Sequence, residues 1–104
     1  MITRRHIALL TLALLILTPA LYADGAATFK SKCAMCHGPD GAGQTAMGKS
    51  LKLRDLRSAE VQKQTDAALV KWITDGKGKM PSYKGKLAPA DIDAVVAYIR
   101  TLKK

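Results

Sequence analysis

The sequence lacks the patterns that would indicate a β-rich or repetitive fold. No segment alternates apolar and polar residues in the way a half-buried strand does, and there is neither an internal repeat nor a low-complexity run. What remains is helical spacing of apolar residues, interrupted by stretches rich in glycine and lysine. The sequence therefore predicts an all-α protein of three to four helices joined by long loops.

A long hydrophobic run is also missing. The main apolar stretch, Ile7 to Leu17, has 11 residues, whereas a transmembrane helix needs about 20. It follows two arginines and precedes Ala23, a small residue at a plausible cleavage point. This order is typical of a secretory signal peptide over residues 1–23. An uncleaved anchor is the alternative, although no cysteine lies near the cleavage point to carry a lipid.

The processed chain would be short and basic. Cleavage after Ala23 leaves residues 24–104, a single domain of 81 residues, and the formal net charge falls from +9 to +7 because two arginines are removed with no acid. A chain of this length has a marginal apolar core and often depends on a disulfide, a metal or another group that staples it. We therefore expect the sequence to supply such a group.

Capping residues and apolar spacing place the first helices. Asp24 is a suitable N-cap for a helix that runs to about Cys36. The range Ser58–Lys63 predicts a short helical turn. Thr65 can cap a further helix over "DAALVKWITD", and Gly76 is a suitable stop for it.

The last helix is predicted to start near Pro89, a favoured first helical residue. Ala88, at its N-cap, has no side-chain acceptor. Its apolar stripe consists of Ile92, Val95, Val96, Ile99 and Leu102. Two stretches, Gly38–Ser50 and Gly76–Lys86, are predicted to be long loops because they are rich in glycine and polar residues.

Both cysteines and one of the two histidines fall within five residues, "CAMCH". Cys33, Cys36 and His37 stand at positions i, i+3 and i+4, which share one face of a helix. The pattern C-x-x-C-H is typical of c-type haem attachment, in which each thiol adds to a vinyl group and the imidazole reaches the iron. A backbone carbonyl is the acceptor we expect for the other ring nitrogen of His37.

Three other uses of these residues fit less well. A structural zinc site needs four ligands, and residues 24–104 hold two cysteines and one histidine, since His6 lies in the predicted signal peptide. A thioredoxin-like redox pair needs a βαβ context, which is absent. A disulfide could form after export, but it would close a very small loop.

With this motif the chain resembles the class I c-type cytochromes, small proteins with one haem. The resemblance extends over "CAMCHGPDGAG", "GKGKMPSY" and "DIDAVVAYIRTL", and thus over essentially all of residues 24–104. It also includes Gly25 and Phe29, eight and four residues before the first cysteine, and Tyr98 in the last helix, which pack together in that family. The resemblance implies the cytochrome c fold and one covalently bound haem c.

A second axial ligand would close the iron to substrates. The candidates are Met35, Met47 and Met80. Met35 lies inside the attachment motif, and Met47 could fill a gap in its loop. Met80 precedes Pro81, which stiffens the backbone that presents the sulfur, and the resemblance also points to Met80. A loop methionine that only packs on the haem edge is the alternative.

The resemblance implies a periplasmic electron carrier that transfers one electron through a haem with His37 and Met80 as axial ligands, and not an enzyme. Two alternatives stay open: a haem subunit of a larger oxidoreductase, and a haem enzyme or sensor with an open sixth position. Trp72, Tyr83, Gln44 and Arg54 could line the pocket or bind the haem propionates, or be plain packing and solvated residues.

Lysines gather near the two motifs. They are Lys30, Lys32, Lys77, Lys79, Lys84 and Lys86. Lys30 and Lys32 precede Cys33, and the other four flank Met80, so both groups should lie near the haem crevice. There they would steer a redox protein with an acidic docking face. The alternative is that these lysines only form a solvated surface. Aromatic residues do not interleave with the basic ones, so nucleic-acid binding is not expected. We expect a monomer.

Overall fold

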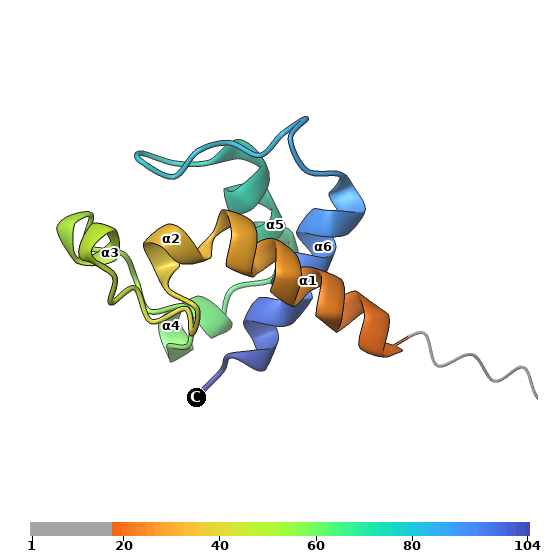
Figure 1. Cartoon of the computed structure of the whole chain (residues 1–104), viewed down its shortest axis with the longest axis horizontal. Helices are drawn as coiled ribbons and strands as arrows, with labels where there is room; N and C mark the ends of the chain where they lie inside the picture. Colours follow the sequence, from red (N-terminus) through yellow and green to blue (C-terminus); the bar gives the residue numbers. More distant parts are fainter. Residues whose placement is uncertain (1–17) are drawn as a thin grey trace, which may run out of the picture.

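The structure is a computed structural model that describes residues 18–104, with side chains from Asp24 onward. Within this range the chain forms six helices and no β-strand (Figure 1). They are α1 (Thr18–Lys32), α2 (Ala34–His37), α3 (Ala46–Ser50), α4 (Ala59–Gln62), α5 (Asp66–Asp75) and α6 (Pro89–Thr101). The all-α prediction is confirmed, but these residues form six helices and not three to four, because the first predicted helix is divided at Cys33 and α3 forms within a predicted loop. Residues 1–17 of the predicted signal peptide lie outside the described residues. Within residues 18–104, no helix is long and apolar enough to cross a membrane.

Two predicted elements are wrong in part. The first helix begins at Thr18, so Asp24 lies inside α1 and is not its N-cap; proline is tolerated in a first turn, and the alanine-rich sequence that follows continues the helix. The predicted loop Gly38–Ser50 contains α3. Its N-cap is Thr45, whose side chain accepts a hydrogen bond from the amide of Gly48 at 2.8 Å. This cap starts a helical turn in a glycine-rich segment.

The helix that was predicted to run to about Cys36 is interrupted. It ends at Lys32, and Cys33 has a φ of −115°. The amide of Cys33 still donates to Phe29 O at 2.8 Å, whereas the amide of His37 donates to Cys33 O at 3.0 Å and starts a new turn. Cys36 and His37 therefore lie on the separate helix α2, and Cys33 lies at the joint.

The other helix signals are confirmed. The side chains of Ser58 and Thr65 cap α4 and α5. Gly76 ends α5 with a φ of +71°, a conformation that glycine adopts easily. Pro89 opens α6, and its N-cap Ala88 makes no side-chain capping bond.

Helices α1 and α6 cross closely, as Figure 1 shows. The crossing point is Gly25: a Cβ placed there would lie 2.1 Å from Ala94 O and 3.2 Å from Tyr98 Cβ. One turn further along α1, the ring of Phe29 lies 5.3 Å from that of Tyr98. The predicted packing of Gly25, Phe29 and Tyr98 is therefore present.

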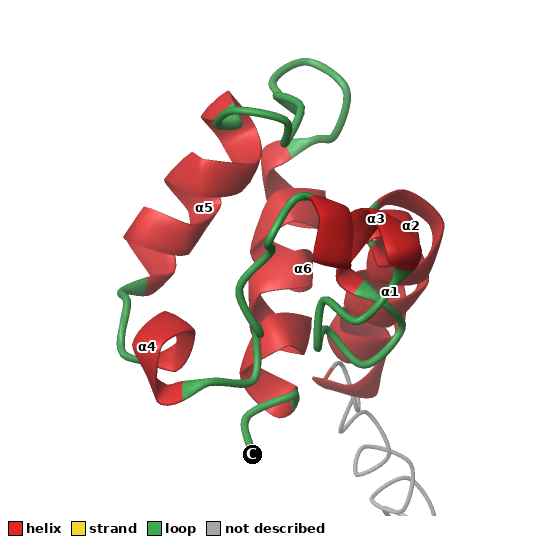
Figure 2. Cartoon of the chain, turned by 90° about the vertical axis from the view of Figure 1, so that its left-hand side faces the viewer, coloured by secondary structure: helices red, strands yellow, loops and turns green. Residues whose placement is uncertain are grey.

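The core lies between α1, α4, α5 and α6. In Figure 2, α5 and α6 run side by side and α4 lies below the start of α5. The buried residues of this cluster are Phe29, Val61, Leu69, Ile73, Ile92, Val95, Val96 and Ile99. Gln62 links α4 to α6, because its Nε2 donates to Ile99 O and to Leu56 O, both at 2.9 Å. Leu102 of the predicted stripe is only partly buried.

We expect Gly25→Val to lower the free energy of unfolding of the protein by roughly 2 kcal/mol or more, because the new side chain meets backbone that cannot retreat. Ala27→Val, on an exposed position of the same helix, is the matched control and should cost far less. Guanidinium titration followed by circular dichroism measures both. Equal losses in the two variants would show that the crossing is not tight.

Candidate functional site

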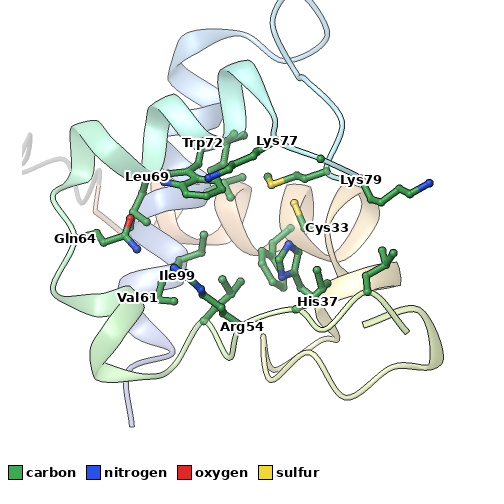
Figure 3. Close-up of a pocket in the computed structure, with 18 of the residues that line it drawn as sticks. Cys33, His37, Arg54, Val61, Gln64, Leu69, Trp72, Lys77, Lys79 and Ile99 are labelled. Carbon is green, nitrogen blue, oxygen red and sulfur yellow. The ribbon is translucent and has the colours of Figure 1, made fainter. Parts of the chain in front are cut away.

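A cavity of about 440 Å³ opens between α2, α5, α6 and the loops 51–56 and 77–80 (Figure 3). Small-molecule and cofactor sites commonly have volumes of roughly 300–1,000 Å³. Its apolar wall consists of Phe29, Leu51, Leu53, Leu56, Val61, Leu69, Ile73, Val95 and Ile99. Its other side chains are Cys33, His37, Lys52, Arg54, Gln64, Trp72, Lys77, Lys79 and Met80.

Three of the four residues predicted for the site line this one cavity: Cys33, His37 and Met80. Cys36 does not line it, although it is close enough to Cys33 to affect that thiol. Both thiols are free and partly buried. Burial, together with Cys36, raises the pKa of Cys33 to about 11. Redox-active and zinc-binding cysteines need an accessible thiolate, which a raised pKa disfavours.

His37 is held at the cavity wall as a neutral imidazole. Its ring lies 6.5 Å from that of Phe29, and burial lowers the pKa of His37. Nδ1 is buried and makes no hydrogen bond with any described residue. The carbonyl acceptor predicted for one ring nitrogen is thus not found at Nδ1. A neutral imidazole with an unpartnered nitrogen suits metal ligation, which requires the unprotonated ring.

The end of α2 is fixed by the segment that follows it. The amide of Gly43 donates to His37 O at 2.8 Å, and Thr45 Oγ1 donates to Cys36 O at 2.6 Å. Gly48 packs against the same turn, since a Cβ there would lie 2.6 Å from Cys36 O. These contacts satisfy the free carbonyls at the helix end and set the position of the motif.

The segment that carries Met80 is an ordered turn. Lys77 and Met80 exchange both backbone hydrogen bonds, at 3.1 and 3.0 Å, around Gly78, whose φ is +58°. Gly76 approaches this turn so closely that a Cβ would lie 2.6 Å from Met80 O. Met80 is partly buried against the core.

The chain after Met80 is tied to two helices. Ser82 Oγ donates to Thr74 O at 2.7 Å, and the amide of Tyr83 donates to Ile73 O at 3.1 Å, so both bind the end of α5. The hydroxyl of Tyr83 donates to Lys32 O, at the end of α1, at 3.0 Å. Burial, with a smaller effect of the two cysteines, raises the pKa of Tyr83, so the hydroxyl keeps its proton.

Of the four further residues predicted to line the pocket or bind the propionates, two line the cavity and two do not. Trp72 and Arg54 line the cavity, while Tyr83 does not and Gln44 is exposed elsewhere. The other two methionines of residues 24–104 are also outside the cavity: Met35 and Met47 expose 82% and 48% of their surface.

Two polar residues of the cavity wall, Lys52 and Gln64, were not predicted from the sequence. Lys52 follows α3 with a φ of +56°, a conformation rarely adopted by residues other than glycine. The only signal for it is its place beside Arg54 in "LKLRDL". Gln64 stands in the polar stretch "QKQTD", which carries no signal, because its position depends on how α4 and α5 pack.

The cavity is lined by cations and by no carboxylate: Lys52, Arg54, Lys77 and Lys79. The Nζ of Lys77 lies 4.7 Å from the centre of the Trp72 ring. The predicted lysine cluster is only partly at this cavity. Lys30 and Lys32 are exposed outside it, and Lys84 and Lys86 line a second groove beside the start of α6.

Comparison with known proteins finds similarity along most of the chain. Residues 20–99 match the family of subunit III of cbb3-type cytochrome c oxidase. Cytochrome c6 of Nostoc sp. is 38% identical over 85 residues, which cover 79% of this chain and 74% of that protein. Cytochrome c6 of Synechocystis sp. is 39% identical over 77 residues; the match covers 74% of this chain and 62% of the relative's length.

The solved structures give the same result. The c-type cytochrome KustC0563 superposes with a TM-score of 0.73 at 35% identity, and the match covers 78% of this chain and 99% of that one. At this identity both fold and sequence are shared, and the family match over residues 20–99 spans all residues that line the cavity.

Thr45 both caps α3 and holds the carbonyl of Cys36, so its hydroxyl supports the motif from outside. We expect Thr45→Val to lower the free energy of unfolding by roughly 1–3 kcal/mol, because two hydrogen bonds are lost at similar volume. Thr45→Ser keeps the hydroxyl and should retain most of the stability. A serine variant as unstable as the valine variant would contradict this role.

Proposed function

Because the chain belongs to the class I c-type cytochromes, whose cofactor is one covalently bound haem c, we propose that it is an electron carrier in which Cys33 and Cys36 attach the haem and His37 and Met80 bind its iron. The observation that carries this proposal is that Cys33, His37 and Met80, from two separate segments, line one cavity. Haem c supplies one-electron redox chemistry when bound.

The residues present fit this cofactor. The wall is mainly apolar, as a porphyrin face requires, and it carries one imidazole with an unpartnered buried nitrogen and one thioether sulfur. The cations of the wall complement the negative charge of the haem carboxylates.

In this proposal the protein leaves the iron without a free binding position and keeps it nearly motionless. His37 is fixed by the contacts at the end of α2, and Met80 by the Lys77–Met80 turn. With both side chains as ligands, a substrate has no open position, and thioether ligation raises the reduction potential. This favours electron transfer over catalysis and argues against an enzyme or a gas sensor.

A permanent redox subunit of a larger complex is the second candidate, and the matching family, named after an oxidase subunit, favours it. A free monomeric carrier is favoured by the surface. The large exposed hydrophobic residues among those described are Met35, Met47 and Trp72, which come from three different helices. Size-exclusion of a native extract distinguishes the two, because a subunit elutes with its partners.

We further propose export to the periplasm, supported by the signal-peptide pattern of residues 1–23.

The first measurement is an absorption spectrum of the exported protein, oxidised and reduced, with and without carbon monoxide. We expect low-spin c-type bands that carbon monoxide does not change, because Met80 would bind the iron and leave no position for another ligand. Met80→Ala should bind carbon monoxide readily and lose the methionine-to-iron charge-transfer band. Met47→Ala, which removes an exposed methionine, is the control and should leave the spectrum unchanged. Ready binding of carbon monoxide by the wild type at neutral pH would refute the carrier.

We also propose that Lys77 and Lys79 steer acidic redox partners to the haem. Both are exposed and lie on the turn that presents Met80, at the rim of the cavity. Charges so close to the site of electron transfer raise the encounter rate with anions.

The test replaces both lysines by glutamine and uses small oxidants of opposite charge. At low salt, oxidation of the reduced protein by ferricyanide should slow by roughly threefold or more, while oxidation by a cationic cobalt complex should speed up. Both effects should disappear at high salt. Removing two exposed lysines elsewhere, as in Lys63→Gln/Lys103→Gln, is the matched control. Equal effects in both double variants would mean that only net charge matters.

A further inference from the structure

The polar side chains of the cavity are spread along its length. Figure 3 shows Cys33 and His37 at one end, with Lys79 extending outward beside them. Gln64 lies at the other end, and Arg54 and Trp72 lie between it and the cysteine, on opposite walls. Gln64 and Arg54 have no role in attaching the haem or binding its iron.

Haem c is itself two-ended. Its two thioether bonds form on one edge of the porphyrin, and its two propionates leave the opposite edge. A haem attached at Cys33 therefore carries its carboxylates toward the end of the cavity that is farthest from the thiol. We propose that Arg54 and Gln64 bind these carboxylates, a role that rests on the proposed attachment at Cys33.

Arg54 is presented by a segment that is fixed on both sides. The amide of Leu53 donates to Gly48 O and that of Leu56 to Gly41 O, each at 2.9 Å. Asp55, the next residue, is bound by Arg57 through Nε at 3.0 Å and through the backbone amide at 2.9 Å. The hydrogen bond from Arg57 holds the pKa of Asp55 well below its usual range, so this anchor persists at neutral pH.

The guanidinium of Arg54 has donors to spare. Its Nη1 lies 3.4 Å from Glu60 Oε1, and both side chains are 59% exposed. Such a surface pair is weak and uses a fraction of the five N–H groups. Glu60 directly precedes the cavity residue Val61, so the pair places the guanidinium beside α4, on the Gln64 side of Cys33 and His37. No other acid competes there, since no carboxylate lines the cavity.

Gln64 also has a fixed backbone and a side chain without a hydrogen-bond partner among the described residues. Its amide donates to Val61 O at 3.0 Å, and its own carbonyl accepts from Arg100, which also binds Gln62 O at 2.7 Å. Its backbone is therefore fixed between α4 and α6. Its half-buried side chain makes no hydrogen bond with another described residue and faces an apolar wall. A carboxylate there would accept from its amide group.

The test compares changes of equal charge at the two ends, by optical redox titration at low ionic strength. Arg54→Gln should lower the reduction potential, because removing a cation beside the carboxylates favours the oxidised haem. We expect a change of at least about threefold in the equilibrium constant of reduction. Lys79→Gln, which removes the same charge from the rim at the Cys33 end, should shift it by less than half as much. Arg54→Lys should keep most of the wild-type potential.

A second pair tests Gln64 with the opposite charge change. Gln64→Glu places a carboxylate beside the propionates. Because the like charges repel, it should lower both the reduction potential and the free energy of unfolding. Gln44→Glu, on an exposed glutamine outside the cavity, should do neither.

The outcomes separate this inference from the proposed function. Equal shifts within both matched pairs, or an Arg54→Lys variant as affected as Arg54→Gln, overturn the carboxylate site while the low-spin spectrum stands. Absence of c-type bands in the wild-type protein overturns the proposed function first, and with it the premise of attachment at Cys33.

Discussion

The close approach of α1 and α6 at Gly25 is the constraint on which the rest of the structure depends. Because backbone meets backbone there, the two helices have one relative position. That position brings Phe29 against Tyr98 and sets the start of α2 one turn later, with the ring of His37 near that of Phe29. The wall that carries the attachment motif is thus aligned with the core by a residue that has no side chain.

The opposite wall is built differently, by a turn and not by a helix. The segment around Met80 has no apolar stripe of its own, and its order comes from backbone groups: the Lys77–Met80 pair and the bonds of Ser82 and Tyr83 to the end of α5. These bonds use carbonyls that a helix end leaves free. The two walls meet through the hydroxyl of Tyr83, which binds the last carbonyl of α1.

Much of this arrangement could be predicted from the sequence, for identifiable reasons. Ser58, Thr65 and Pro89 mark helix starts through local chemistry, and the spacing of Cys33 and His37 fixes their common wall. These features depend on residues that are neighbours along the chain, so the sequence displays them directly.

The positions that the sequence did not predict correctly depend on tertiary packing. The closeness of Lys84 and Lys86 to Met80 in the sequence predicts a place at the crevice, but the chain turns away after Tyr83 and carries them to another groove. Gln64 reaches the cavity only because α4 and α5 are held by α6, through contacts such as those of Arg100. Both outcomes depend on tertiary packing, which local patterns do not encode.

The turn that carries Met80 has a consequence for ligand exchange. Its backbone bonds do not involve the sulfur, so they persist when a bond between the proposed ligand and iron breaks. If Met80 is the ligand, the freed sulfur would stay beside the metal at a high effective concentration, as in an intramolecular reaction, where values far above any dissolved ligand's concentration are usual. Recapture would outpace the entry of small molecules, and the iron would be protected kinetically as well as by the strength of the bond.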